Sequence, residues 1–148
     1  MRRLCRVGVI LLALGWFPVA LAGQASGVDA PPHAQNRGFE LHQNYPNPFN
    51  PSTRIPFTLY PELFDGNKPV VVTARIYNLL QQLVAIPTAL NHPAGNVPLD
   101  QLEYTTPGYK EAYWDGLDQN GRKVPAGIYY LQFIVNGHRV VRKMVMGR

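Results

Sequence analysis

The chain has 148 residues, of which 14 are basic, 9 are acidic and one is a cysteine, and its formal net charge is +5. Arg2, Arg3 and Arg6 belong to the first segment, so that 11 basic residues remain against the 9 acidic ones, a charge of +2. No cluster of lysine and arginine interleaved with aromatic residues is left, and a nucleic-acid-binding protein is therefore not indicated. The rest of the chain is long enough for one domain with a single core.

The first 22 residues have the three parts of a cleavable signal peptide. The arginines precede an apolar run from Val7 to Val19, and Ala20-Leu21-Ala22 forms an A-x-A cleavage site. Because the run is short and contains Pro18, it is a poor membrane span. We expect cleavage after Ala22, export, and no stable membrane span in the mature protein. The sole cysteine, Cys5, leaves with this segment.

Residues 23–40 are small, polar and proline-bearing, and they predict a flexible linker ahead of one domain over residues 41–148. The domain opens with a proline-rich segment, the clip, which comprises Tyr45, Pro46, Asn47, Pro48, Phe49, Asn50 and Pro51. Each proline fixes its own φ and moves the preceding residue away from helical geometry, and asparagine favours Asx turns. We expect a rigid, non-helical segment that holds Tyr45 and Phe49 in fixed directions, with Phe49 in the core.

Short strand-like runs follow the clip, separated by turn signals, as in a β-sandwich. Alternating apolar residues predict strands over residues 55–59, 70–77, 82–86, 110–114, 128–135 and 139–146, with Asn136-Gly137 as a two-residue hairpin turn. Pro56 cannot donate to a ladder, so the first of these strands is expected at an edge. The predicted fold is an all-β, immunoglobulin-like sandwich of about seven strands.

Three kinds of aromatic residue can be distinguished in the second half of the chain. Trp114 alternates with Ala112 and is expected in the core. Tyr109 and Tyr113 fall on the opposite face of the same strand, where exposed aromatic residues are expected. Tyr129, just after Ala126-Gly127, is expected to tie a strand corner to the backbone.

The loop from Asp115 to Gly121 comes nearest to a metal site. Asp115, Asp118 and Asn120 could offer oxygens to Ca²⁺, but the third position is Leu117 and no glutamate follows at the EF-hand distance. The preferred interpretation is a tight turn, in which Asn120-Gly121 takes positive φ values and the aspartates cap backbone donors. No metal or other cofactor is expected.

No catalytic constellation is visible, and we expect a protein that is not an enzyme. The four histidines have no metal-ligand spacing, and no serine or cysteine lies in a nucleophile motif. A pair of carboxylates such as Asp115 and Asp118 would need a cleft to cleave a glycoside, and a sandwich of this size offers little cleft.

Five segments stand in a recognisable order: QNYPNPFNPSTRIPF from Gln43, ARIYNLLQQLV from Ala74, YWDGLDQNGRKVPAGIYY from Tyr113, LQFIVNG from Leu131, and RKMVMGR at the terminus. Together they resemble the type A C-terminal sorting domains of the type IX (Por) secretion system, related to the immunoglobulin-like domain of flagellar hook-capping proteins. The structural motif of these domains corresponds to the clip and to Trp114, Asp115, Gly116, Asn120, Gly121, Gly127 and Tyr129.

The resemblance also marks two departures. Relatives usually carry glycine where this chain has Gln81, which costs about 1 kcal/mol if the turn needs a left-handed residue. The stretch from Asn91 to Pro107 is longer than the usual connection, and Leu99 to Tyr104 is predicted to form a helical turn inside it.

The function that the resemblance implies is a non-enzymatic sorting module, recognised by type IX machinery at the outer membrane and delivered through the periplasm to the cell surface or medium. Its recognition signal lies in the last strand, at Lys143, Met144, Val145, Met146 and Arg148, with Arg148 in place of the usual lysine. An exposed edge strand can be extended by a partner strand. Because a terminal edge strand gives up few core contacts when it is shortened from its free end, removing residues 143–148 is expected to block surface delivery even where the domain still folds.

The alternative function is a free-standing adhesive or scaffolding sandwich that binds protein or carbohydrate. It would use a strand edge or the face that carries Tyr109 and Tyr113.

Overall fold

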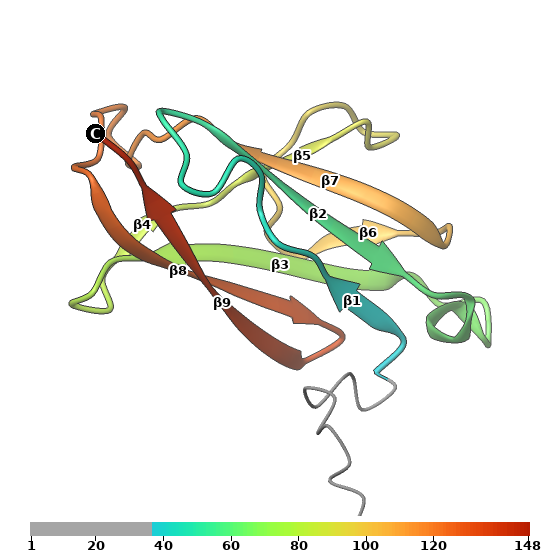
Figure 1. Ribbon diagram of the computed structural model, residues 1–148. Coiled ribbons are helices and arrows are strands. Elements are labelled where there is room, and N and C mark those ends of the chain that lie inside the picture. Colours follow the sequence, from blue (N-terminus) through green and yellow to red (C-terminus); the bar gives the residue numbers. More distant parts are fainter. Residues whose placement is uncertain (1–36) are drawn as a thin grey trace, which may run out of the picture. The chain divides into compact units, whose positions relative to one another are not determined.

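The structure, a computed structural model, describes residues 37–148. Within this range the chain forms nine strands in two antiparallel sheets and one 3-10 turn at Pro61–Phe64, which confirms the predicted all-β sandwich (Figure 1). The strands are β1 (Phe39–Leu41), β2 (Thr53–Leu59), β3 (Val70–Tyr77), β4 (Leu83–Ala85), β5 (Thr88–Leu90), β6 (Leu102–Tyr104), β7 (Gly108–Trp114), β8 (Gly127–Val135) and β9 (His138–Met146). The expected signal peptide over residues 1–22, with its cleavage site at Ala20 and Ala22, lies outside the described residues. Phe39 and Glu40 belong to β1 and not to a linker.

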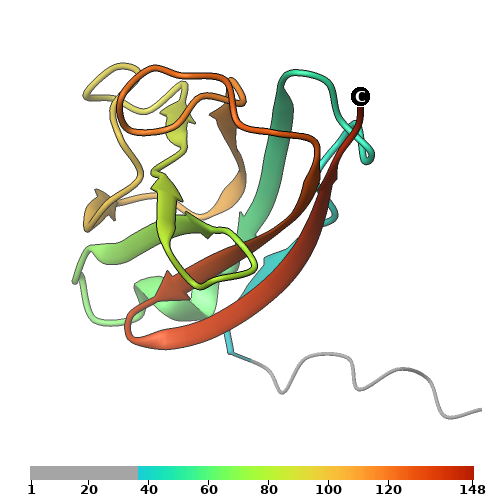
Figure 2. The ribbon, with the colours of Figure 1, turned by 90° about the vertical axis from the view of Figure 1, so that its left-hand side faces the viewer.

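Sheet A has the strand order β1-β2-β7-β5, and sheet B has the order β4-β3-β8-β9, with β6 pairing the first residues of β3. Figure 2 views the domain from the end where β9 finishes and shows the strands of the two sheets around a common core. β1 and β9 are edge strands of different sheets, and a guanidinium nitrogen of Arg142 donates to the carbonyl of Leu41 across the gap between them. These two edges therefore lie side by side.

The core follows from the alternation of side chains along the strands. The four alternate residues from Val70 to Ile76 are fully buried, as the sequence predicts for one face of β3. Phe57 of sheet A meets Phe133 of sheet B with ring centroids 4.9 Å apart. The two inner faces thus interdigitate through aromatic and β-branched residues.

β2 is an interior strand, so the edge position predicted from Pro56 is wrong. Both β1 and β7 pair with β2, but the ladder with β1 covers only Phe57 to Leu59. Pro56 lies one residue beyond that ladder, and its carbonyl accepts the N–H of His42. The missing donor of Pro56 faces the same neighbour, so the return hydrogen bond to His42 is absent and the ladder with β1 stops there, while the pairing of β2 with β7 continues.

Residues 91–107 close one side of the sandwich, and the helical turn predicted inside them is not formed. Leu99 is fully buried; its N–H donates to the carbonyl of Pro87, and its own carbonyl accepts the N–H of Ala74. Residues 102–104 form β6 on the edge of β3. An extended backbone prevails because it can bond to the edges of both sheets at once, which a helical turn could not do.

Two turns use left-handed residues. Asn136-Gly137 joins β8 to β9 with φ values of 46° and 85°, the geometry of the predicted hairpin turn. Gln81 has φ of 59° in the turn between β3 and β4. The side-chain oxygen of Asn78 accepts the N–H groups of Leu80 and Gln82 and holds that turn closed.

Candidate functional site

The clip is held in place by its own flanks. Tyr45 exchanges two backbone hydrogen bonds with Arg54, which returns the chain to β2. Beside this pair, the buried side chain of Asn44 donates to Thr53 Oγ1 at 3.0 Å, and the hydroxyl of Thr53 donates to the carbonyl of Pro46 at 3.0 Å. The bonds Tyr45-Pro46, Asn47-Pro48 and Asn50-Pro51 are cis. The segment is non-helical, as predicted.

The clip directs its two aromatic residues oppositely. Tyr45 has 45% of its surface exposed, and its hydroxyl donates to Glu111 on the outer face of β7. Phe49 has 1% of its surface exposed and packs on Trp114 with ring centroids 5.3 Å apart. Trp114 is itself buried and has Tyr129 on another side at 5.3 Å. Phe49 and Trp114 are core residues, as predicted.

The clip pairs with the end of β9, a contact that sequence reasoning missed. Phe49 lies beside Met146 in a parallel bridge: its N–H donates to the carbonyl of Val145 at 2.9 Å, and its carbonyl accepts the N–H of Gly147 at 2.7 Å. Asn47 adds a third bond, because its side-chain oxygen accepts the N–H of Val145 at 2.9 Å. In Figure 1 and Figure 2 the clip lies next to the C-terminus.

The five residues of the expected recognition signal differ in exposure. Met144 and Met146 point into the core, with 0% and 7% of their surfaces exposed. Val145 is half-buried under the clip, and only Lys143 and Arg148 are exposed. The carbonyl of Arg148 also accepts the side-chain amide of Asn50 at 2.8 Å.

The expectation that removing residues 143–148 gives up few core contacts is therefore wrong. Their removal would take away two core methionines and every hydrogen bond between the clip and the terminal segment. The end of the strand is paired with β8 on one side and with the clip on the other.

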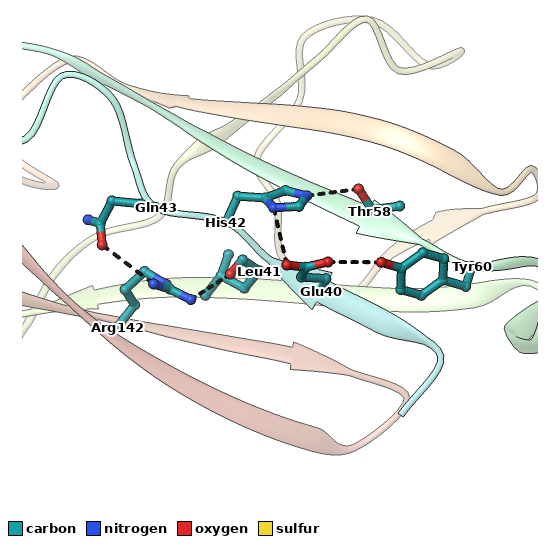
Figure 3. Close-up of polar contacts among 7 residues, drawn as sticks. All are labelled: Glu40, Leu41, His42, Gln43, Thr58, Tyr60 and Arg142. Carbon is teal, nitrogen blue, oxygen red and sulfur yellow. Dashed lines mark hydrogen bonds and ion pairs between the residues drawn. The ribbon is translucent and has the colours of Figure 1, made fainter. Parts of the chain in front are cut away.

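The middle of the β9 edge stays open. In the β8–β9 ladder, alternate residues of β9 direct their N–H and C=O groups away from β8, and Val141, Lys143 and Val145 are among them. Val145 is taken by the clip, whereas the outward groups of Val141 and Lys143 have no partner within residues 37–148. Arg142 bridges from this stretch to β1, donating to the carbonyl of Leu41 at 2.6 Å (Figure 3).

Gly116 fits closely against the clip. An ideal Cβ at this position would lie 2.2 Å from the carbonyl oxygen of Pro51, and φ is +77°. Asp115 accepts the N–H of Leu117, whose own carbonyl accepts the indole N–H of Trp114 at 2.9 Å. The Trp-Asp-Gly segment thus positions the tryptophan and leaves room for the clip.

The Asp118 carboxylate is occupied by its own turn. It accepts the backbone N–H groups of Arg122 and Asn120 and the guanidinium of Arg122. These bonds, led by the backbone N–H of Arg122, hold the pKa of Asp118 below its ordinary value. Within the part of the chain that the structure describes, no three His, Cys, Asp or Glu side chains come together as metal ligands. The geometry is that of a capped turn, although the positive φ expected at both Asn120 and Gly121 is found only at Gly121.

Tyr129 ties the start of β8 to the preceding loop. Its hydroxyl donates to the carbonyl of Pro125 at 2.7 Å. Gly127, the first residue of β8, pairs with Met146 at the end of β9. The corner predicted for this tyrosine is formed.

Sequence reasoning missed the polar cluster around Glu111. Glu111 Oε1 accepts the hydroxyls of Tyr45 and Tyr109, and Glu111 Oε2 accepts Arg54 at 2.7 Å. The hydroxyl of Tyr45, with help from Tyr109 and Arg54, holds the pKa of Glu111 below its ordinary value, while burial acts in the opposite direction. The alternation of Tyr109, Glu111 and Tyr113 along one face of β7 was the available signal.

No protein-family profile matches the chain, and no curated protein matches it either. Among solved structures, dimeric latent PorU from Porphyromonas gingivalis matches with a TM-score of 0.48 and 20% sequence identity. The match covers 73% of this chain and 9% of the PorU chain. No conclusion about function rests on this likeness. Within residues 37–148, no helix has the length and apolar character needed to cross a membrane.

Proposed function

We propose that the domain is a non-enzymatic sorting module, recognised by type IX secretion machinery at the outer membrane and delivered to the cell surface. The observation that carries this proposal is the meeting of three motif segments at one end of the domain. The clip, the Trp-Asp-Gly segment and the terminal segment are distant in sequence, yet Phe49 contacts Trp114 and pairs with Met146. Together these contacts hold the end of β9 in one position.

The recognition surface that we propose is the exposed part of this end. A partner could reach the charges of Lys143 and Arg148 and the outward backbone groups of Val141 and Lys143. Backbone groups of this kind provide affinity through strand addition, whereas the two charges assist docking. Met144 and Met146 are buried, so a partner does not contact them, and their role is to pack the end of β9 against the core.

The test is delivery of a reporter in a bacterium that has the type IX system. Residues 23–148, the chain expected after cleavage, are fused behind an exported reporter, and surface delivery is compared between the unchanged chain and the double variant Lys143→Ala, Arg148→Ala. Both residues are exposed, so thermal stability should change by less than about 0.5 kcal/mol while delivery falls. Lys68→Ala with Lys123→Ala is the matched control, since it removes two exposed positive charges that lie outside β9.

Equal delivery of both double variants at the level of the unchanged chain would contradict the proposed role of these charges. Retention of the unchanged fusion in the periplasm would contradict the sorting function itself.

A further inference from the structure

The outer face of sheet A carries a connected group of aromatic and charged side chains, here named the tyrosine face: Glu40, His42, Tyr45, Arg54, Tyr109 and Glu111. β2 and β7 pair so that Thr58 stands opposite Tyr109 and Pro56 opposite Glu111. The clip brings Tyr45 over the same surface. This face lies on the opposite sheet from the terminal strand and has no part in the proposed sorting role.

Glu111 fixes the centre of the tyrosine face. Both tyrosine hydroxyls donate to the same carboxylate oxygen, that of Tyr109 at 2.8 Å, and Arg54 donates to the other. The side chain of Glu111 has 15% of its surface exposed. The two rings are therefore anchored at their tips, while 45% of Tyr45 and 57% of Tyr109 remain exposed.

A second set of contacts extends the face toward β1 (Figure 3). His42 Nε2 lies 2.9 Å from Thr58 Oγ1, and His42 Nδ1 lies 3.6 Å from a Glu40 carboxylate oxygen. The hydroxyl of Tyr60 donates to the other oxygen of Glu40 at 2.8 Å. The ring of His42 lies next to that of Tyr109, with centroids 6.3 Å apart, and so joins both sets.

Such a face can both donate and accept hydrogen bonds. The two tyrosine hydroxyls give their protons to Glu111, so their oxygens keep lone pairs for a ligand. Arg54 is 48% exposed, and within residues 37–148 only its Nη1 is engaged, by Glu111. A tyrosine ring adds an apolar surface beside these polar groups. Sugars match this combination, because each pyranose ring has hydroxyl edges and apolar C–H faces.

The charge of the face restricts the kind of glycan. Arg54 and Glu111 cancel, and Glu40 leaves one negative charge when His42 is neutral. These groups therefore offer a polyanion no excess of positive charge, whereas a neutral chain needs none. The anchored rings also need little ordering on binding, which lowers the entropic cost of association. We propose that the tyrosine face binds a neutral polysaccharide chain.

The experiment is affinity electrophoresis of the full chain in native gels that contain soluble polysaccharide. The neutral probes are xyloglucan, galactomannan and dextran, and the acidic probe is polygalacturonate. We expect retardation by at least one neutral probe and none by the acidic one. Tyr109→Ala should weaken that retardation about tenfold, because it removes the most exposed ring of the face.

The matched control is Tyr130→Ala, which removes a tyrosine that is 37% exposed on sheet B. It should leave the retardation unchanged. Arg54→Gln, a second variant that keeps the rings, should weaken binding, and a cooperative melting transition shows that the variant remains folded. The proposal is overturned if no neutral probe retards the chain, if only polygalacturonate does, or if Tyr109→Ala and Tyr130→Ala behave alike.

Discussion

At Gly116, the addition of a Cβ atom should have a large effect on the stability of the domain. The carbonyl oxygen of Pro51 lies 2.2 Å from where the Cβ would be. We expect Gly116→Ala to lower the free energy of unfolding by about 2–5 kcal/mol, the sum of a left-handed alanine and an overpacked contact.

Gly121→Ala is the control for Gly116→Ala. Gly121 has nearly the same φ, +76°, but no atom lies within 4 Å of its ideal Cβ. It should lose only the conformational part, about 1–2 kcal/mol. Urea denaturation of both variants measures the difference, and equal losses would show that the Pro51 contact is unimportant.

Phe49 tests whether the clip contributes to the core. Its ring is buried against Trp114, so Phe49→Ala should destabilise the domain by about 3–5 kcal/mol. The urea midpoint reports the loss. A change below about 0.5 kcal/mol, which is typical of a surface site, would contradict the buried position.

Gln81 is a left-handed residue with a side chain, since its φ is 59°. Replacing it with glycine removes the side-chain clash but gives the unfolded chain more freedom. We expect Gln81→Gly to change stability by between zero and about 1 kcal/mol in the stabilising direction. A clear loss of thermal stability would show that the glutamine side chain contributes to the turn.

At the scale of elements, Asn47 links the clip to β9. Asn47→Ala leaves the N–H of Val145 without its acceptor, and we expect a loss of about 1–2 kcal/mol. Hydrogen exchange should accelerate at the amide of Val145. Asn96→Ala is the control, because Asn96 is exposed and has no hydrogen bond within the described residues. Equal exchange in both variants would contradict the pairing.

Glu111 links β7 to β2 and to the clip, and its titration gives the domain a pH dependence. Its pKa lies below the ordinary 4.5 in the folded protein, so the unfolded chain binds the proton more readily. The stability from this carboxylate is complete above pH 4.5 and is lost as the pH falls through the lower, folded pKa. Melting temperatures between pH 7 and pH 3 should therefore fall less steeply for Glu111→Gln. An unchanged slope would contradict this contribution.

The sequence predicts elements best where the signal is local. Asn136-Gly137 specifies its own hairpin, and the alternate apolar residues of β3 specify its buried face. β5 and β6 were missed because Pro87, Pro93 and Pro98 interrupt any strand pattern. These short strands are extended because they pair with β7 and β3. Leu99 is a strong helix former that tertiary contacts hold extended.

At the scale of the whole molecule, the sandwich is closed on both sides by segments without strong strand propensity. Residues 97–99 bond to β3 and β5 on one side, and the clip with Arg142 joins β9 to sheet A on the other. The pairing of Asn47 with Val145 spans 98 residues, and no local pattern encodes it. Because the clip occupies the end of β9, the open strand edge is confined to the middle of β9, at Val141 and Lys143.

The parallel bridge between Phe49 and Met146 also sets an order of events during biosynthesis. In a chain made from its N-terminus, Phe49 lacks these backbone partners until residues 145–147 have been made, because Val145 and Gly147 supply them. Contacts between such distant residues form late and slowly. Any translocation that begins before residues 145–147 are made therefore meets a domain in which these hydrogen bonds have not yet formed.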